Sequence, residues 1–347
     1  MYKQQLKETV GDLRLGAPLS DGPLSILPLR AKAEVKARYV LLHQALERGR
    51  LTITEVDEAG SVPYLVARNR GPWPVLIFDG EELVGAKQNR IANATILVAV
   101  GKTVLPVSCV EQGRWSSRSR AFSAGTYTSH PSLRSLKERH VREAMMAGMP
   151  AERRATGDAG AEGPRRETAQ SERAQRYRSK QGEVWDEVGK TVHALGAFAP
   201  TMAMSDSYEA GKDDLDRMMK TFAPESLFVN EDVVGVAVFW GGEFVCLDLL
   251  QPAKRFALLY PKLLRGYALE ALMFAKLGDE PKAAPEGFDP EAATLRLFAE
   301  ILEAEVEEQP GVDLGDDLRL ETKQVSGAGL VWEEEVIQLS VFPRKAA

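Results

Sequence analysis

Polar side chains that could bind or transform a ligand gather in two neighbouring stretches of the sequence. DGEELVGAKQNR spans residues 79–90 and SCVEQGRW spans residues 108–115, and each contains or follows an apolar run typical of a β-strand. We expect these two strand ends to present carboxylates, amides, guanidinium groups and an indole to one cleft. The predicted ligand-binding residues are Lys87, Gln88, Asn89, Arg90, Gln112, Arg114 and Trp115.

These residue types suit an anionic ligand that carries a ring. Arg90 and Arg114 have planar guanidinium groups that bind phosphate or carboxylate in bidentate fashion, and Trp115 offers a face for a base or a sugar. The candidate catalytic residues are the glutamates that could act as a general base, namely Glu81, Glu82 and Glu111. The alternative is structural, because the same residues could form a salt-bridged, hydrogen-bonded corner that locks the sheet.

Common catalytic signatures are missing from the sequence. It contains no Walker loop, no GxGxxG, HExxH or GxSxG motif and no protein-kinase set. The four histidines are scattered along the chain, and a packed imidazole is the expected outcome for His43 and His193, which lie in apolar helical patterns. Cys109 and Cys246 sit in apolar runs, which favours buried free thiols over a zinc site. We therefore predict no metal site, and the sequence names no cofactor.

The elements that must position these residues are mostly short strands in the first third of the chain. Residues 51–115 contain several β-branched or aromatic runs separated by turn-forming residues. In one run Ile96 and Val98 alternate with Leu97, which predicts a strand covered on both faces. The sequence predicts an α+β fold, with an antiparallel β-sandwich or distorted barrel in the first third and packed helices and a second β-layer from the rest. It leaves sandwich and barrel open.

Composition divides the chain into three parts. Residues 15–140 form a β-rich part, and residues 141–181 form an Ala/Arg/Glu-rich stretch with few large aliphatic side chains, which we interpret as a mobile connector. Residues 182–343 form an α+β part that we expect to pack with the first as one unit. In this last part Gly241-Gly242 predicts a hairpin turn, and Asp289-Pro290 predicts the start of a helix.

Length and charge limit the classes of partner. The chain has 347 residues, 44% of them hydrophobic, and a formal net charge of -6, which disfavours general nucleic-acid binding. No apolar run approaches the eighteen residues of a membrane span, and the first residues lack a signal-peptide core, so we expect a cytoplasmic protein without membrane contact. The sequence leaves a homo-oligomer open.

The strings VLIFDGEELVGAKQNRIANATILV and TVLPVSCVEQGRW carry a family resemblance, together with GVAVFWGGEFVCLDLLQPAKRFALLYPKLLRGYALEAL. They resemble the ARG and rhodanese-phosphatase-superfamily-associated protein domain family, and the similarity runs from about Leu15 to Phe342. The family is largely uncharacterised. Its name records an association with ADP-ribosylglycohydrolases, so the resemblance implies a setting in nucleotide or ADP-ribose metabolism.

Three functions remain after these observations. The first is binding of a small anionic or nucleotide-like ligand, such as an ADP-ribose derivative. The second is a scaffold or protein-interaction module, in which the polar stretches only stabilise the sheet. The third is a hydrolase or transferase that acts on such a ligand with a glutamate as general base. The sequence therefore leaves open whether the protein is an enzyme.

Overall fold

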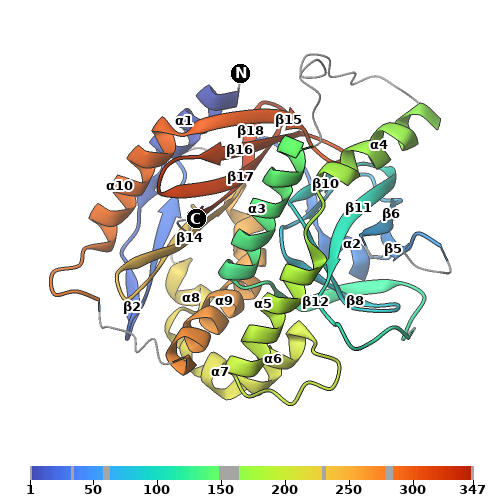
Figure 1. Cartoon of the computed structure of the whole chain (residues 1–347). Helices are drawn as coiled ribbons and strands as arrows, with labels where there is room; N and C mark the ends of the chain where they lie inside the picture. Colours follow the sequence, from blue (N-terminus) through green and yellow to red (C-terminus); the bar gives the residue numbers. More distant parts are fainter. Residues whose placement is uncertain are drawn as a thin grey trace.

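The computed structural model describes residues 2–32, 35–57, 63–116, 118–147, 164–228, 232–277 and 284–344. In these ranges the strands form a closed barrel, a large antiparallel sheet and a small sheet, with helices packed around them (Figure 1). The predicted α+β class is confirmed. Of the two predicted alternatives for the first strands, sandwich and barrel, the structure shows the barrel. None of the helices in these ranges has the length and apolar character needed to cross a bilayer.

The barrel is made from residues 51–128, which extend a little beyond the first third of the chain. Its strands follow one another around the barrel in the order β11 (Gly101–Cys109), β6 (Tyr64–Asn69), β5 (Leu51–Glu55), β12 (Phe122–Thr128), β8 (Glu81–Gly85) and β9 (Arg90–Ala92). Alternate residues point inward, because successive side chains of a strand face opposite sides. Ile53, Leu83 and Leu105 fill the interior, whereas Ile91 faces outward to a separate apolar cluster under the helices.

The large sheet is the second β-layer and joins the two ends of the sequence. Its order is β1 (Arg14–Leu15), β3 (Leu24–Arg30), β13 (Val233–Trp240), β14 (Glu243–Leu250), β18 (Glu335–Pro343), β17 (Val325–Trp332), β16 (Asp316–Glu321) and β15 (Glu305–Pro310), with β2 (Leu19–Asp21) also paired to β3. Since β3 pairs antiparallel with β13, a strand near residue 30 is held by one beyond residue 230. The first and last parts of the chain therefore share one sheet.

The small sheet lies between the two apolar cores. In it β4 (Val40–Leu41) pairs in parallel with β7 (Val75–Ile77), which pairs antiparallel with β10 (Ile96–Val98). Ile96 and Val98 belong to the barrel core, and Leu97 belongs to the core beneath the large sheet. The prediction that this strand is covered on both faces is confirmed.

Helices cover both faces of the large sheet. On the face toward the barrel lie α3 (Pro131–Ala147) and α9 (Ala253–Lys276), and on the other lie α1 (Tyr2–Asp12) and α10 (Pro290–Glu303) (Figure 1). The remaining helices in the described ranges are α2 (Leu42–Glu47), α4 (Pro164–Arg176), α5 (Gln181–Ala194), α6 (Met204–Ala210), α7 (Lys212–Thr221) and α8 (Pro224–Leu227).

The predicted connector at 141–181 falls on several elements. Its first residues belong to α3, residues 164–176 form α4, and α5 begins at Gln181; residues 148–163 lie outside the described ranges. Ala174 and Tyr177 are buried, and the Tyr177 backbone oxygen accepts a hydrogen bond of 2.9 Å from Asn93 Nδ2. The end of this stretch therefore packs against the barrel, while the mobility expected for its middle stays a prediction.

Candidate functional site

The predicted site residues divide between two places in the barrel wall. Glu82, Asn89, Glu111 and Arg114 meet outside the barrel, in a cluster that we call the motif corner. Arg114 Nη2 lies 2.6 Å from Glu111 Oε2, and Arg114 Nη1 donates at 2.8 Å to each of two backbone oxygens, those of Ala86 and Ser116. These contacts hold the loop after β8 against the loop after β11.

Protein donors surround the carboxylates of the motif corner. The Asn89 amide donates to Glu111 Oε2 at 3.1 Å, and Thr201 Oγ1 donates to the other oxygen at 3.2 Å. Burial alone would raise the pKa of Glu111, but the hydrogen bonds from Arg114 and Asn89 outweigh it, so this pKa lies below its usual value. Glu111 and Arg114 therefore form a buried charged pair in which both Nη atoms of Arg114 are bonded, while its Nε has no partner in the described residues.

Glu82 is the member of the corner with the fewest donors. Its Oε1 accepts one hydrogen bond of 3.3 Å from Asn89 Nδ2, and it lies under β12 at Gly125, where an added Cβ would come within 2.6 Å of Glu82 Oε2. Burial disfavours the charged form and raises the pKa of Glu82 to about 7, and the nearby charge of Glu111 adds to the effect. Glu82 therefore holds its proton to a higher pH than an exposed glutamate does.

The third predicted glutamate faces elsewhere. Glu81 Oε1 accepts from Lys262 Nζ at 3.0 Å, and its Oε2 accepts from the Phe78 amide at 2.9 Å. The three candidate general bases are at most 1% exposed, and each has a donor from the protein. The structure thus places none of them in an open cleft in the described residues.

Arg90 lies inside the barrel, at the end where β5, β9 and β11 meet their loops. It stands opposite Cys109, and its Nη1 donates to Gln88 Oε1 at 2.9 Å. Glu55 is the nearest carboxylate, at 3.8 Å from Arg90 Nη2, and the Nε and Nη2 atoms have no hydrogen-bond partner in the described residues. Arg90 and Arg114 thus do not act as a pair, because they face opposite sides of the barrel wall.

The remaining predicted residues are at the rim beside Arg90. Lys87 Nζ and Arg90 Cζ lie 5.4 Å and 5.7 Å from the centroid of the Trp115 ring. Trp115 and Gln112 are exposed, and the Gln112 backbone oxygen accepts a hydrogen bond of 3.4 Å from Gln88 Nε2. This rim brings together Lys87, Gln88, Arg90 and Trp115, and it leaves Asn89 and Arg114 in the motif corner.

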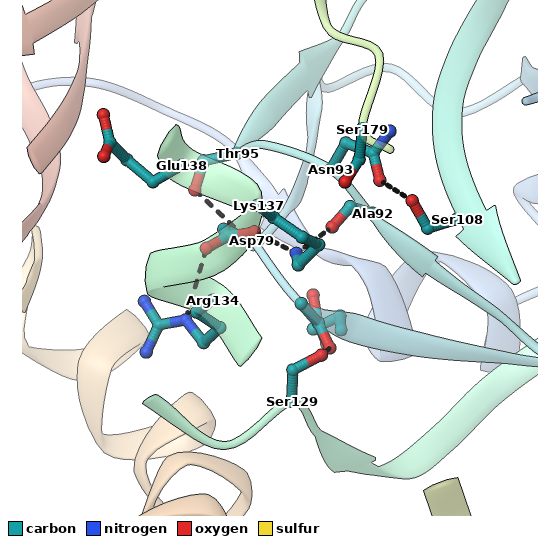
Figure 2. Close-up of polar contacts among 12 residues, drawn as sticks. Asp79, Ala92, Asn93, Thr95, Ser108, Ser129, Arg134, Lys137, Glu138 and Ser179 are labelled. Atoms are coloured by element: carbon teal, nitrogen blue, oxygen red, sulfur yellow. Dashed lines mark hydrogen bonds and ion pairs between the residues drawn. The ribbon is translucent and has the colours of Figure 1, made fainter. Parts of the chain in front are cut away.

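A second charged cluster joins the barrel to the large sheet and is closed to solvent. Arg134 of α3 binds Asp248 of β14 through two hydrogen bonds of 2.7 Å and contacts Asp79 at 3.3 Å. Figure 2 shows Asp79 between Arg134 and Lys137, whose Nζ lies 2.5 Å from Asp79 Oδ1 and 2.6 Å from the Ala92 oxygen. The adjoining cavity measures about 10 Å³, which is the space of a single water molecule. Because no larger ligand fits there, we interpret this cluster as a structural contact between the barrel and the large sheet.

An open pocket lies at the opposite end of the barrel from Arg90, at residues outside the predicted site. This Trp73 pocket has a volume of about 140 Å³ and is lined by Val40, Gln44, Ala45, Arg48, Arg50, Asn69, Gly71, Pro72, Trp73 and Val75. No Asp or Glu is among these lining residues. The Trp73 side chain is 44% exposed, which is unusual for an indole and leaves a face for a ligand.

The local sequence explains how Trp73 is presented. Asn69 ends β6, and its Oδ1 accepts from the Gly71 amide at 2.9 Å while its Nδ2 donates to the Trp73 oxygen at 2.9 Å. Asn is favoured in such turns because its side chain mimics the backbone. At Gly71 an added Cβ would lie 3.3 Å from the Arg50 side chain, so the glycine lets Arg50 pack against the turn. Together Asn69 and Gly71 set the indole beside the arginine.

Several cations surround this pocket without paired carboxylates. Arg48 and Arg50 form no salt bridge with any residue that the structure describes, and Arg38 Cζ lies 5.9 Å from the centroid of the Trp73 ring. Arg255 reaches the same area, since its Nη1 donates to Gln44 Oε1 at 3.2 Å. Burial lowers the pKa of Arg255, and the positive charge of Arg48 lowers it further. The pocket is therefore electropositive.

The two cysteines are buried free thiols, as predicted from their apolar surroundings. Burial raises the pKa of Cys109 to about 11 and that of Cys246 well above its ordinary value. No group of three or more His, Cys, Asp or Glu side chains in the described ranges is arranged to hold a metal ion. The cysteines therefore do not compete with the electropositive pocket as a candidate site.

Comparison with known proteins identifies the family of the chain. The model of the ARG and Rhodanese-Phosphatase-superfamily-associated Protein domain matches residues 12–342. The chain therefore belongs to this family, as its sequence strings had suggested. No curated protein and no solved structure matched the chain.

Proposed function

We propose that this family member binds a small anionic ligand with a planar ring in the Trp73 pocket. One observation carries the proposal: two arginines that form no salt bridge with any described residue line a hollow beside a half-exposed indole. Guanidinium groups bind phosphate and carboxylate oxygens, and an indole face stacks on a base or sugar ring. A nucleotide-like molecule has both of these groups.

The size of the pocket limits which part of the ligand it holds. A volume of about 140 Å³ is below the roughly 300 to 1,000 Å³ of sites that enclose a drug-sized molecule. The pocket therefore accepts one ring or one phosphate group, and the rest of a ligand the size of ADP-ribose would extend over the surface. Arg38 and Arg255 are placed to meet an anionic extension, because both flank the lined hollow.

The other two functions have less support from the geometry. A glutamate general base needs access to a bound water or substrate, and Glu81, Glu82 and Glu111 are buried among protein donors. A scaffold calls for a continuous apolar patch, and the large apolar side chains that are exposed in the described ranges come from separate elements, such as Phe198, Leu258 and Leu295. The exposed indole beside two arginines that have no carboxylate partner among the described residues is a more specific feature than either.

Calorimetric titration tests the proposal with a matched set of probes. We expect AMP and ADP-ribose to bind, adenosine to bind at least about tenfold more weakly, and inorganic phosphate to compete. Binding should quench tryptophan fluorescence in the wild type, and the quenching should be lost in Trp73→Phe. Comparable binding of adenosine and AMP would contradict a role for the arginines.

Variants then locate the site. The double variant Arg48→Gln, Arg50→Gln should weaken AMP binding by about 100-fold, since each charge-assisted contact contributes on the order of 1.5 kcal/mol or more. The control Arg296→Gln removes one exposed positive charge on α10, far from the pocket, and should leave binding unchanged. AMP binding that survives the double variant would reject this pocket as the site.

A further inference from the structure

A hydroxyl, an imidazole and a carboxylate line up where α3 meets the start of α5. The Ser179 hydroxyl oxygen lies 2.9 Å from His140 Nδ1, and His140 Nε2 lies 2.9 Å from Glu183 Oε2. His140 is buried on α3, whereas Ser179 is partly exposed just before α5. A nucleophile, a base and an orienting acid within hydrogen-bond reach define a catalytic triad by geometry and not by sequence position.

The hydrogen bonds also fix the protonation of the imidazole. The Lys180 backbone amide donates to His140 Nδ1 at 3.3 Å, so Nδ1 carries no proton, and Nε2 carries the proton that points to Glu183. Ser179 therefore donates its hydroxyl proton to Nδ1, and it has no other partner in the described residues. Burial lowers the pKa of His140 and keeps the ring neutral at neutral pH, as a general base must be.

A similar group elsewhere in the protein shows what a purely structural arrangement looks like. His130 Nδ1 lies 2.8 Å from Glu270 Oε2, and its Nε2 lies 3.1 Å from Thr191 Oγ1. All three side chains are buried, and the Thr191 hydroxyl donates its proton to the Glu187 oxygen at 3.0 Å. The Thr191 hydroxyl proton is therefore already hydrogen-bonded to the backbone of its own helix. The Ser179 hydroxyl differs because it donates to the imidazole and reaches solvent.

The start of α5 supplies donors for a developing negative charge. Lys180 is the N-cap residue of this helix, and no side chain caps it. The first amides of a helix have no intrahelical acceptor, so those of Gln181 and Gly182 are available to an oxyanion. Beyond its own helix and chain neighbours, an added Cβ at Gly182 would meet no described atom within 4 Å, which leaves space for a substrate there.

We propose that Ser179, His140 and Glu183 form a hydrolytic site for small acyl esters, separate from the Trp73 pocket. The Ser179 oxygen attacks the ester carbonyl while its proton passes to His140 Nδ1. The alcohol then leaves with that proton as its bond to carbon breaks, and an acyl group remains on Ser179. Water attacks this acyl group, gives a proton to His140 and releases the acid with Ser179 restored. Glu183 acts as a positioning residue that holds the imidazole.

A fluorophosphonate probe tests the site on the unaltered protein. The Ser179 oxygen should displace fluoride from phosphorus, so intact mass should show one adduct per chain and peptide mapping should place it on Ser179. The same protein should hydrolyse p-nitrophenyl acetate in a reaction that Ser179→Ala abolishes. An unlabelled Ser179, under conditions that label a known serine hydrolase, would overturn the proposal without any variant having to fold.

Further variants separate catalysis from structure. His140→Asn should slow labelling at least about 100-fold, the usual contribution of a general base, while Ser116→Ala and Thr191→Val should leave the rate unchanged. The charged groups around His140 are Glu183, Lys180 and Arg139. In Glu183→Gln the pH at which labelling begins should fall, because the carboxylate raises the pKa of His140. If the pH at which labelling begins does not change in Glu183→Gln, or if His140→Asn is labelled at the wild-type rate, the proposed roles of these residues are wrong.

Discussion

Arginines lie in both the motif corner and the Trp73 pocket, but the arginine of the corner is buried and those that line the pocket are exposed. In the corner, Arg114 is buried and meets Glu111 at 2.6 Å along with two backbone oxygens. In the pocket, Arg48 and Arg50 are exposed and form no salt bridge in the described residues. Removing a guanidinium from a buried ion pair destabilises the fold, and an exposed guanidinium without a carboxylate remains available to a ligand.

The largest effect should come from breaking the pair in the corner. Arg114→Gln leaves Glu111 buried without its cation, so the free energy of unfolding should fall by about 3 to 5 kcal/mol. Chemical denaturation followed by circular dichroism measures this loss. Arg118 offers a matched control, because it lies 3.8 Å from the same carboxylate but is 61% exposed.

Arg118→Gln should change the free energy of unfolding by less than about 1 kcal/mol, the usual limit for an exposed ion pair. Equal losses of unfolding free energy in the two variants would show that burial does not determine how much each arginine contributes to stability. A negligible loss in Arg114→Gln would instead return Arg114 to the predicted ligand-binding set.

Local features of the fold were predictable because their causes are local. Asp289 caps α10 by accepting from the Glu291 amide at 2.9 Å, and the predicted hairpin at Gly241-Gly242 joins β13 to β14 with positive φ at both glycines. The polar stretches also fall at strand ends, as their sequence indicated. Each of these features depends on residues only a few positions apart.

Contacts between distant residues were not predictable from one sequence. The side of the barrel wall that Arg90 faces depends on strand register, since a shift of one residue reverses every side chain. The prediction of a joint Arg90 and Arg114 site lacked that information. Likewise, His140 and Ser179 are 39 positions apart, and only the packing of α3 on the start of α5 brings them together. The turn around Trp73 carried no signal in the sequence beyond a tryptophan close to Arg68 and Arg70.

The second-largest effect is the change of the free energy of unfolding with pH that Glu82 of the motif corner causes. Burial raises the pKa of Glu82 from 4.5 to about 7 in the folded protein. Between these pH values the unfolded chain loses the proton and the folded protein keeps it, so stability falls as pH rises through this window and levels off above it. At about 1.4 kcal/mol for each unit of pKa, the loss totals roughly 3 kcal/mol.

Glu82→Gln removes this titration and keeps an acceptor for Asn89. The variant should therefore be more stable than the wild type at about pH 8, by up to roughly 3 kcal/mol, and should have no such advantage near pH 4.5. Urea denaturation at a series of pH values measures the difference. Glu243→Gln, at an exposed position on β14, should follow the wild-type curve, and parallel curves for Glu82→Gln and wild type would contradict the raised pKa.

The smallest effect is expected in the pocket. The double variant Arg48→Gln, Arg50→Gln removes two cations that form no salt bridge with the described part of the chain, so the free energy of unfolding should stay within about 0.5 kcal/mol of the wild type. At low salt the variant should melt slightly higher, because Arg255 no longer faces the positive charge of Arg48. This gain should vanish at about 1 M salt, where charges are screened beyond about 3 Å. Thermal melts at the two salt concentrations measure both expectations. A loss above about 1 kcal/mol would show that these arginines stabilise the fold as Arg114 does, and it would remove the physical basis for a ligand in the Trp73 pocket.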